Sequence, residues 1–280
     1  MSMKFGLIGA KLGHSLSPRI HKELFSRRGL AASYELLEMP AEQLPSQLER
    51  LRQEYTGMNV TIPHKIAVMP YLDSISPEAA AIGAVNTIAF REGKALGYNT
   101  DYFGFGRMLE HYGLTPTGKD VCVLGTGGAA RAVLQYLTDC RSRSITLCSR
   151  DISKVAPDLR QRFAIKNYAD LPALQGDLLV NCTPVGMFPK IEVSPADASV
   201  MAHFGAAVDL IYNPPVTCFL ALAQQQKKPA LNGLFMLVAQ AVAAEEIWLG
   251  QKFSGAFIAS LTERIAAGET ENNKIDVIRY

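Results

Sequence analysis

Lys65 and Asp101 are the two residues of this sequence whose types and surroundings best suit acid–base chemistry. Lys65 ends the stretch NVTIPHK, where a strand-like run stops and a helix is expected to begin at Pro63. A cation in the first turn of a helix opposes the helix dipole at a cost of roughly 0.3–1 kcal/mol, so we expect an anionic group nearby. Asp101 lies between a strand and a glycine-punctuated helix start, where it could also be a plain N-cap. In a closed cleft, a Lys–Asp pair can hold and transfer a proton.

Hydroxyl and amide side chains stand at other element ends in the same part of the chain. Ser17 precedes a proline and fits an N-cap, whereas Ser15 has no capping role to fill. Asn59 and Thr61 lie two apart and therefore share one face of a strand. Asn86, in GAVNT, could equally well cap a helix or make a turn. Together with the Lys–Asp pair, these groups would suit a small polyhydroxylated acid.

A glycine-rich turn in the middle of the chain predicts a dinucleotide-binding unit. VCVLGTGGAARAVLQYL (121–137) reads as a strand, a turn and a helix, with Gly125, Gly127 and Ala130 in the pattern G-x-G-x-x-A. The glycines allow the tight turn and the close approach of a pyrophosphate to the helix N-terminus. A glycine triplet alone is weak, but this one follows a strand and opens a helix. A turn without a ligand is therefore disfavoured.

The end of the next strand, SITLCSRD, bears on the choice of cofactor. Ser149, Arg150 and Lys154 suit the 2′-phosphate of NADP, because a guanidinium pairs well with phosphate oxygens. Asp151 would repel that phosphate if it pointed inward, and it could accept a hydrogen bond from an NAD ribose. NADP is favoured and NAD stays open.

Composition limits the classes of protein to which the chain could belong. It has 280 residues, 48% of them hydrophobic, and a net charge of +2, which is typical of a globular protein of one large or two ordinary domains. The near-neutral charge predicts no nucleic-acid partner, and no apolar run approaches the length of a membrane span. Five cysteines without a C-x-x-C pair predict reduced, buried thiols and a cytoplasmic location. No metal site is predicted.

Apolar runs alternate with helical patterns along most of the chain, which predicts an α/β protein with mostly parallel strands. The expected strands are 4–8, 34–38, 57–61, 87–91, 94–98, 120–124, 144–148, 178–181 and 206–209. The expected helices are 18–28, 40–54, 64–72, 103–112, 128–138, 218–226 and 233–250.

A Gly/Pro/Thr-rich seam at 111–120 separates two predicted lobes. We expect a Rossmann-type NADP-binding domain at 104–236, inserted into an α/β substrate-binding domain made of 1–103 plus 237–280. A deep cleft between the lobes would hold the site.

Eight blocks, in order, give the chain its resemblance to the shikimate dehydrogenase family: HSLSPRIH, NVTIPHK, GAVNT, NTD, GTGGAAR, NCTPVGM, DLIYNP and GLFMLVAQA. They span nearly the whole chain. The resemblance implies two α/β domains around a deep cleft and the NADPH-dependent, reversible reduction of 3-dehydroshikimate to shikimate, in the pathway to chorismate and the aromatic amino acids. It implies a small-molecule substrate, and the sequence leaves a monomer or a homodimer open.

The resemblance also implies roles for individual residues. Lys65 and Asp101 would be the catalytic pair. The substrate would be bound by Ser15, Ser17, Asn59, Thr61, Asn86, Tyr212 and Gln240. The cofactor would be bound by Gly125, Thr126, Gly127, Gly128, Ala129, Ser149, Arg150, Lys154, Leu210 and Gly233.

Two departures from the family pattern keep alternatives open. The NADP segment, usually Asn-Arg-Thr, reads Ser-Arg-Asp at 149–151, which allows a quinate/shikimate dehydrogenase that uses NAD or both cofactors. Cys218 replaces a common proline, which we expect to be neutral. A methylenetetrahydrofolate dehydrogenase would leave the polar set without a role, and a non-catalytic NADP-binding sensor would not need Lys65 or Asp101.

Overall fold

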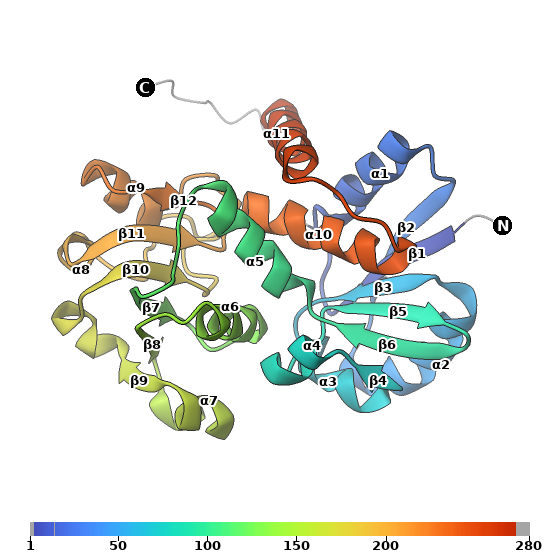
Figure 1. Cartoon of the computed structure of the whole chain (residues 1–280), viewed down its shortest axis with the longest axis horizontal. Coiled ribbons are helices and arrows are strands. Elements are labelled where there is room, and N and C mark those ends of the chain that lie inside the picture. The colour runs from blue at the N-terminus through green and yellow to red at the C-terminus, as the bar shows by residue number, and fades with distance from the viewer. Residues whose placement is uncertain (1–2, 14, 273–280) are drawn as a thin grey trace.

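Two six-stranded sheets organise the chain in the computed structural model, which describes residues 3–13 and 15–272. Each sheet forms the centre of one lobe, and two long helices lie side by side in the middle of the molecule (Figure 1). These are α5 (Thr100–His111), which leads from the first sheet toward the second, and α10 (Leu234–Leu249), which leads back. The chain thus crosses between the lobes twice.

The first sheet has the strand order β2-β1-β3-β5-β6-β4. Its β1, β2 and β3 are parallel, whereas β5 is antiparallel to both β3 and β6, so this sheet is mixed rather than mostly parallel. The strands are β1 Met3–Gly9, β2 Ala32–Glu38, β3 Gly57–Val60, β4 Ser74–Ile75, β5 Thr87–Arg91 and β6 Lys94–Tyr98.

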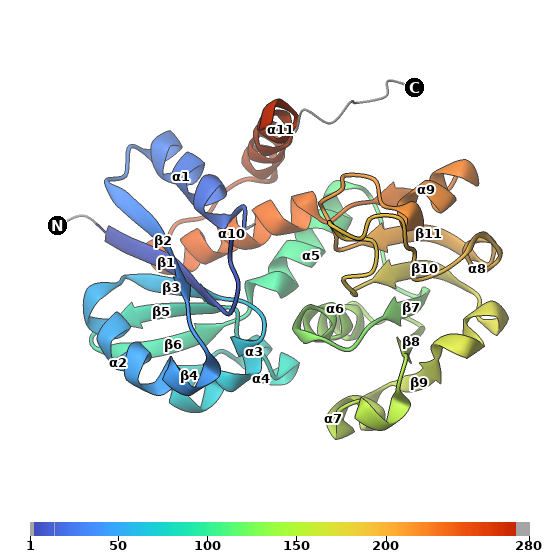
Figure 2. The ribbon, with the colours of Figure 1, turned by 180° about the vertical axis from the view of Figure 1, so that it is seen from behind.

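Helices cover both faces of the first sheet, and the last helix of this lobe lies at the C-terminal end of the described chain (Figure 2). They are α1 Ser17–Arg28, α2 Leu44–Glu54, α3 His64–Ala67, α4 Pro77–Ile82 and α11 Gly255–Asn272, with 3₁₀ turns η1 Ala41–Gln43 and η2 Met69–Tyr71. α10 and α11 pack against each other, and α10 also contacts α1. Residues from beyond the second lobe therefore help to build the first.

The second sheet is parallel throughout, in the order β12-β11-β10-β7-β8-β9. The strand order reverses between β7 and β10, and in sheets of this kind ligands bind at the carboxyl ends of the strands at that point. The strands are β7 Asp120–Leu124, β8 Ser144–Ser149, β9 Ala164–Asn167, β10 Gly176–Asn181, β11 Phe204–Asp209 and β12 Ala230–Leu231. The helices are α6 Gly128–Asp139, η3 Ile152–Lys154, α7 Pro157–Arg162, η4 Tyr168–Ala173, α8 Ala198–Ala202 and α9 Cys218–Gln225.

The predicted α/β class is confirmed, and all nine predicted strands are present. The sequence reading missed the short β4, β9 and β12 and the helices α4, α7, α8 and α11. The two-residue strands β4 and β12 carry too little alternation to be recognised. The predicted helix at 64–72 is a single turn of α-helix followed by a 3₁₀ turn, because Pro70 interrupts it.

The expected domain boundaries, 103/104 and 236/237, lie inside α5 and α10. The core around these helices includes α1 residues such as Ile20, β7 residues such as Val123 and α10 residues such as Val238, so it spans both lobes. The 1–103 plus 237–280 and 104–236 division stays a prediction.

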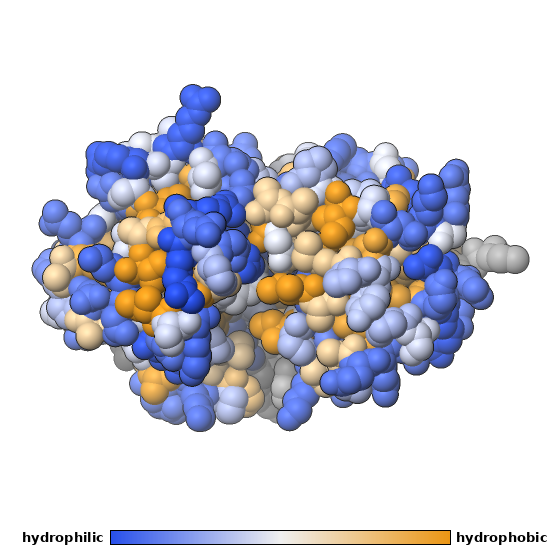
Figure 3. Space-filling view, turned by 90° about the horizontal axis from the view of Figure 1, so that it is seen from below, coloured by the Kyte–Doolittle hydropathy of each residue, from blue (hydrophilic) through white to orange (hydrophobic). Residues whose placement is uncertain are grey.

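The surface is hydrophilic over much of the face seen from below, and it recedes between the two halves (Figure 3). Within the described part of the chain, no helix combines the length and the apolar character that crossing a membrane requires. The five cysteines are free, but only Cys122 and Cys148 are buried, so the prediction of buried thiols was wrong for the other three, which are half-buried.

Candidate active site

An ion pair between Lys65 and Asp101 lies at the centre of the candidate site. Lys65 Nζ donates to Asp101 Oδ2 across 2.5 Å, and only 13% and 10% of the two side chains are exposed. Lys65 comes from α3 and Asp101 from the first turn of α5. Burial at this depth removes most competing water, which makes the pairing stronger and better oriented than at an open surface.

Asn86 fixes the position of this pair. Its Nδ2 donates to Asp101 Oδ1 across 2.9 Å, and its Oδ1 accepts the backbone N–H of Thr100 at 2.7 Å. The preceding residue, Val85, donates its backbone N–H to the Lys65 carbonyl at 2.8 Å. Asn86 therefore does accept an N–H at the start of a helix, but that helix begins fourteen residues further along the chain. Asp101 itself is in the helix and is not the N-cap, which is Asn99.

The expectation of an anion near Lys65 was correct, but the helix dipole from which it was argued is only a minor reason for it. Pro63 lies outside the helix, and α3 is only four residues long. A single turn sums few peptide dipoles, so its field at Lys65 is small. Burial of the ammonium group is the stronger reason that a carboxylate is needed.

Asn59 belongs to the same polar cluster through its neighbours. Its Oδ1 accepts from the Tyr34 hydroxyl at 2.8 Å, and its Nδ2 donates to Thr87 Oγ1 at 3.1 Å and to the Asn86 carbonyl at 3.4 Å. Thr61 follows β3 and is half-buried. The side chain of Asn59 thus connects β3 to Asn86 and to Thr87, the first residue of β5.

The two predicted carboxylate-binding serines lie at the start of α1. Ser15 Oγ accepts the backbone N–H of Ser17 at 3.2 Å, while Ser17 is the first helical residue and its side chain caps nothing. The expectation that Ser17 is the N-cap was therefore wrong, and the supporting role falls to Ser15. This turn-type bond from residue i+2 to residue i satisfies the N–H of the first helical residue.

Gln240 brings α10 to this cluster. Its Oε1 accepts from Thr100 Oγ1 at 3.4 Å, and its Nε2 donates to the Leu237 carbonyl at 2.9 Å. Tyr212, in the loop after β11, packs against the hydrophobic core that spans both lobes. Gln240 thus links α10 to the first turn of α5, next to Asp101.

The glycine loop lies directly against the ion pair. Gly125 has φ of +99°, which excludes most side chains, and Gly127 precedes the first turn of α6. A Cβ atom placed on Gly128 would come within 3.3 Å of Lys65 Cδ, so the lysine stem packs on this glycine. The first turn of α6 packs its Ala130 toward the core with Val133, Leu134 and Leu137. Thr126 and Ala129 flank the same turn.

The groups predicted to bind a 2′-phosphate lie at the end of β8. Ser149 Oγ donates to the Asp151 carbonyl at 3.0 Å, and Arg150 is exposed. The Asp151 carboxylate accepts from the Ser153 N–H at 3.0 Å and pairs with Lys154 Nζ at 3.2 Å. These hydrogen bonds, with that of the Ser153 hydroxyl first, lower the pKa of Asp151. The Asp151 carboxylate is thus bonded to groups of its own turn.

Leu210 and Gly233, predicted to lie near the nicotinamide, are in close contact. A Cβ on Gly233 would lie 2.0 Å from the Leu210 carbonyl oxygen, so only glycine fits there. Asp209 supports this corner: it accepts from Asn181 Nδ2 at 3.0 Å, from the Ile211 N–H at 3.0 Å and from Thr217 Oγ1 at 2.7 Å.

Comparisons with known proteins identify the family. A model of the shikimate dehydrogenase substrate-binding domain matches residues 7–88. A shikimate dehydrogenase (NADP(+)) of Clostridium beijerinckii is 44% identical over 245 residues, which cover 87% of this chain and 91% of the relative. The chain belongs to the shikimate dehydrogenase family.

Solved structures of the shikimate dehydrogenase family share the whole fold. A chorismate mutase/shikimate 5-dehydrogenase fusion protein from Clostridium acetobutylicum aligns with a TM-score of 0.92 and 43% identity, covering 96% of this chain and 98% of that one. Shikimate 5-dehydrogenase from Thermus thermophilus, solved with NADP(H) and shikimate, aligns with a TM-score of 0.85 and 34% identity, covering 94% and 99%. These likenesses confirm the prediction of a substrate-binding lobe joined to a Rossmann-type lobe.

The sequence reading missed Arg131, which joins the two lobes of this family member. Arg131, on α6, forms a two-pronged ion pair with Asp158, with N–O distances of 2.6 and 3.1 Å, and reaches the Ile82 carbonyl of α4 at 3.4 Å. Arg162 donates to the Ala81 carbonyl at 3.2 Å. Arginine side chains can donate to the last carbonyls of a helix, but no sequence motif predicts which arginine will bond to which helix.

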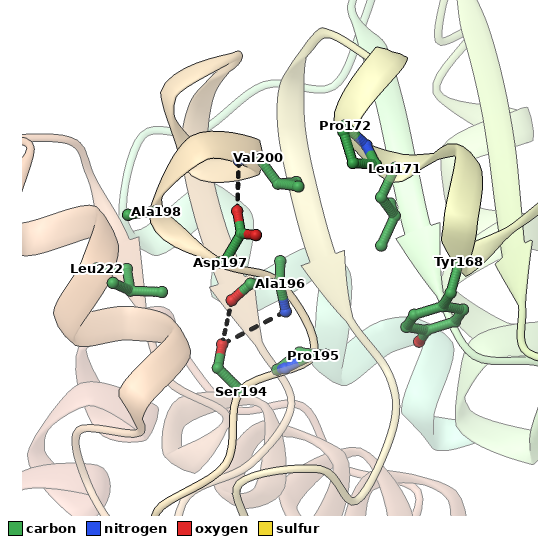
Figure 4. A pocket seen from close by; sticks show the side chains of 10 residues that line it. All are labelled: Tyr168, Leu171, Pro172, Ser194, Pro195, Ala196, Asp197, Ala198, Val200 and Leu222. Atoms are coloured by element: carbon green, nitrogen blue, oxygen red, sulfur yellow. Dashed lines mark hydrogen bonds between the residues drawn. The ribbon is translucent and has the colours of Figure 1, made fainter.

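A pocket of about 500 Å³ opens in the second lobe between η4, α8 and α9 (Figure 4). Ser194 bonds within its own loop, and Asp197 caps α8 through the Val200 N–H. None of the predicted site residues lines it. It is a surface hollow beside the hydrophobic core that includes Leu171 and Val200.

The buried carboxyl of Asp209 should make the stability of the fold depend on pH. Burial raises the pKa of its carboxyl from 3.8 to about 6, although three donors partly offset the effect. The folded state then binds this proton more tightly than the unfolded state, so the group's ionisation costs stability as pH rises through 6. Relative to Asp209→Asn, the wild type should lose about 1 kcal/mol of unfolding free energy between pH 5 and pH 7.5.

Urea unfolding of both proteins at the two pH values measures this difference. The Asn variant lacks the titrating carboxyl and is the reference for all other groups. An unfolding free-energy difference between the two proteins that is the same at both pH values would contradict the assignment.

Proposed function

We propose that this chain is a shikimate dehydrogenase that reversibly reduces 3-dehydroshikimate to shikimate with NADPH. The observation that carries the proposal is the contact of Lys65 with Gly128, because it sets a buried proton-transfer pair of the first lobe against the glycine loop of the second. The family relatives named for this activity support it. Residues 1–103 plus 237–280 would bind the substrate, and residues 104–236 the cofactor.

The second lobe has the groups that NADP needs. Gly127 has no side chain to cap α6, so the first N–H groups of this twelve-residue helix are left for a pyrophosphate. The exposed guanidinium of Arg150 suits the 2′-phosphate. NADP, when bound, supplies or accepts the hydride. The proposed cofactor-binding residues are Gly125, Thr126, Gly127, Gly128, Ala129, Ser149, Arg150, Lys154, Leu210 and Gly233.

The first lobe has donors and acceptors for a hydroxylated ring acid. We assign the carboxylate to the hydroxyls of Ser15 and Ser17 at the start of α1, and propose that Tyr212 helps to bind it. The ring hydroxyls fall to Asn59, Thr61, Asn86, Asp101 and Gln240. Four of these five are linked by hydrogen bonds directly or through Thr87 and Thr100, so they are held in place before a substrate arrives.

Lys65 and Asp101 carry out the proton transfer. As the ring ketone is reduced, negative charge develops on its oxygen, and the Lys65 ammonium stabilises that charge and donates a proton to it. Asp101 Oδ2 aims the ammonium group, and Asn86 holds the other carboxylate oxygen. In the reverse direction, Lys65 accepts the proton from the alcohol.

Observations on two side chains weigh against the other candidate functions. Asp151 is committed to Ser153 and Lys154, which favours NADP over NAD as the preferred cofactor, although quinate as an additional substrate stays open. A non-catalytic sensor would not need the intact Lys65–Asp101 pair. The cytoplasmic location and the monomeric or homodimeric state stay predictions.

The direct test is the oxidation of NADPH by the purified protein with 3-dehydroshikimate. Lys65→Ala should lower kcat at least about a hundredfold, since general acid catalysis typically contributes that much, and should leave the substrate KM within several-fold. Lys22→Ala, an exposed lysine on α1, is the control and should behave as the wild type. An inactive wild type, or a near-normal kcat in Lys65→Ala, would contradict the proposal.

Arg150 provides a separate test of cofactor choice. Arg150→Ala should raise the KM for NADP at least about tenfold, because a charge-assisted hydrogen bond to phosphate contributes roughly 1.5–3 kcal/mol. The KM for NAD should stay within about twofold, since NAD has no 2′-phosphate. Steady-state kinetics with each cofactor measures both, and equal increases would argue against a phosphate contact.

A further inference from the structure

We propose that Tyr34 is a positioning residue for the substrate: its hydroxyl orients Asn59, and a buried His21–Glu245 pair holds its ring in place. The inference rests on the proposed function, since Asn59 is assigned there to the substrate. Tyr34 belongs to none of the sequence motifs that predicted the site.

The Tyr34 hydroxyl bonds to one of the proposed substrate-binding residues. It donates to Asn59 Oδ1 across 2.8 Å. With its oxygen occupied by Tyr34, the Asn59 amide must turn its NH₂ group toward Thr87. The Tyr34 phenol therefore sets the orientation of the Asn59 amide on β3.

The ring of Tyr34 would otherwise be poorly held, because β2 is an edge strand paired only with β1. It stacks on His21, with ring centroids 4.1 Å apart and planes 8° from parallel. His21 Nδ1 in turn bonds to Glu245 Oε1 of α10 at 2.8 Å, and both of these side chains are fully buried. The rings of Trp248 and Phe25 also lie near the imidazole, with centroids 5.5 and 6.1 Å from it.

Burying His21 and Glu245 lowers the stability of the fold, so we expect this pair to do something that two apolar side chains could not. His21 Nε2 and Glu245 Oε2 find no hydrogen-bond partner among the described residues, which adds to the cost of burying them. In return, the imidazole gains a fixed plane against which the Tyr34 ring lies flat. Two apolar side chains would fill the space without fixing a ring orientation.

Tyr34 is suited to act as a permanent donor. Burial raises the pKa of its phenol well above the usual 10, the side chain of Ser17 opposes this shift, and the charge of Glu245 adds to it. The hydroxyl thus keeps its proton at any pH at which the enzyme would work. Asn59 Oδ1 consequently always has a donor facing it.

Removal of the hydroxyl should weaken substrate binding and spare the chemistry. Asn59 would bind the substrate and the transition state alike, and uniform binding of this kind shows in KM rather than kcat. The proton-transfer pair is held by Asn86 instead. The cofactor site lies on the other lobe and should be unaffected.

The experiment compares Tyr34→Phe with Tyr55→Phe. Tyr55 is a matched control, since its hydroxyl donates to Glu35 Oε2 at 2.6 Å in the same lobe, outside the proposed site. For Tyr34→Phe we expect the KM for 3-dehydroshikimate to rise about fivefold to twentyfold, with kcat within threefold and the KM for NADPH unchanged. Tyr55→Phe should stay within twofold in all three constants.

The outcomes separate this inference from the proposed function. An inactive wild type contradicts the function, whereas an active wild type with Tyr34→Phe kinetics equal to those of Tyr55→Phe overturns only the role of Tyr34. A fall in kcat without a rise in KM also overturns it.

A double substitution tests the route through Asn59. If Tyr34 acts through Asn59, adding Tyr34→Phe to Asn59→Ala should raise KM less than it does in the wild type. A full, multiplicative increase in the double variant would show that Tyr34 acts independently of Asn59 and would overturn the route.

Discussion

A buried ion pair, Lys65 with Asp101, is the interaction on which the rest of the site depends. Placing an ammonium and a carboxylate where little water reaches them is favourable only if both are also hydrogen-bonded from elsewhere. Asn86 meets this need for Asp101, and its own amide is held by the start of α5. The polar cluster around the pair therefore has two roles. Its hydrogen bonds offset the cost of burying the two charges, and they also fix the geometry for proton transfer.

The second constraint is that the pair must meet a cofactor bound to another lobe. α5 and α10 cross between the lobes, and each contributes a residue to the cluster, Asp101 and Gln240. Arg131 and Arg162 of the second lobe donate to the last carbonyls of α4, and the Lys65 stem packs on Gly128. Contacts of this kind bring the glycine loop next to the ion pair, as hydride and proton delivery to one ketone requires.

The sequence predicted the parts of the structure that local patterns determine. β7, the turn at Gly125 and α6 were recognisable because strand, glycine turn and helix follow one another directly in the chain. The role of Tyr34 could not be predicted, because its hydroxyl reaches Asn59 across β1 and so depends on the strand order β2-β1-β3. The Ser17 N-cap failed for a local reason: the helix begins one residue earlier than expected, so that Leu16 takes the cap position and Ser15 Oγ accepts the N–H of Ser17. Arg131 was missed because its partners come from α4 and α7.

A double-substitution cycle on Lys65 and Asp101 tests the central claim most directly. The measurement is kcat/KM for 3-dehydroshikimate in Lys65→Ala, in Asp101→Asn and in the protein with both changes. If the two residues act as one unit, the double variant should be no more impaired than the worse single variant, within about threefold. Losses that multiply in the double variant would mean that the two side chains work independently and would contradict the account.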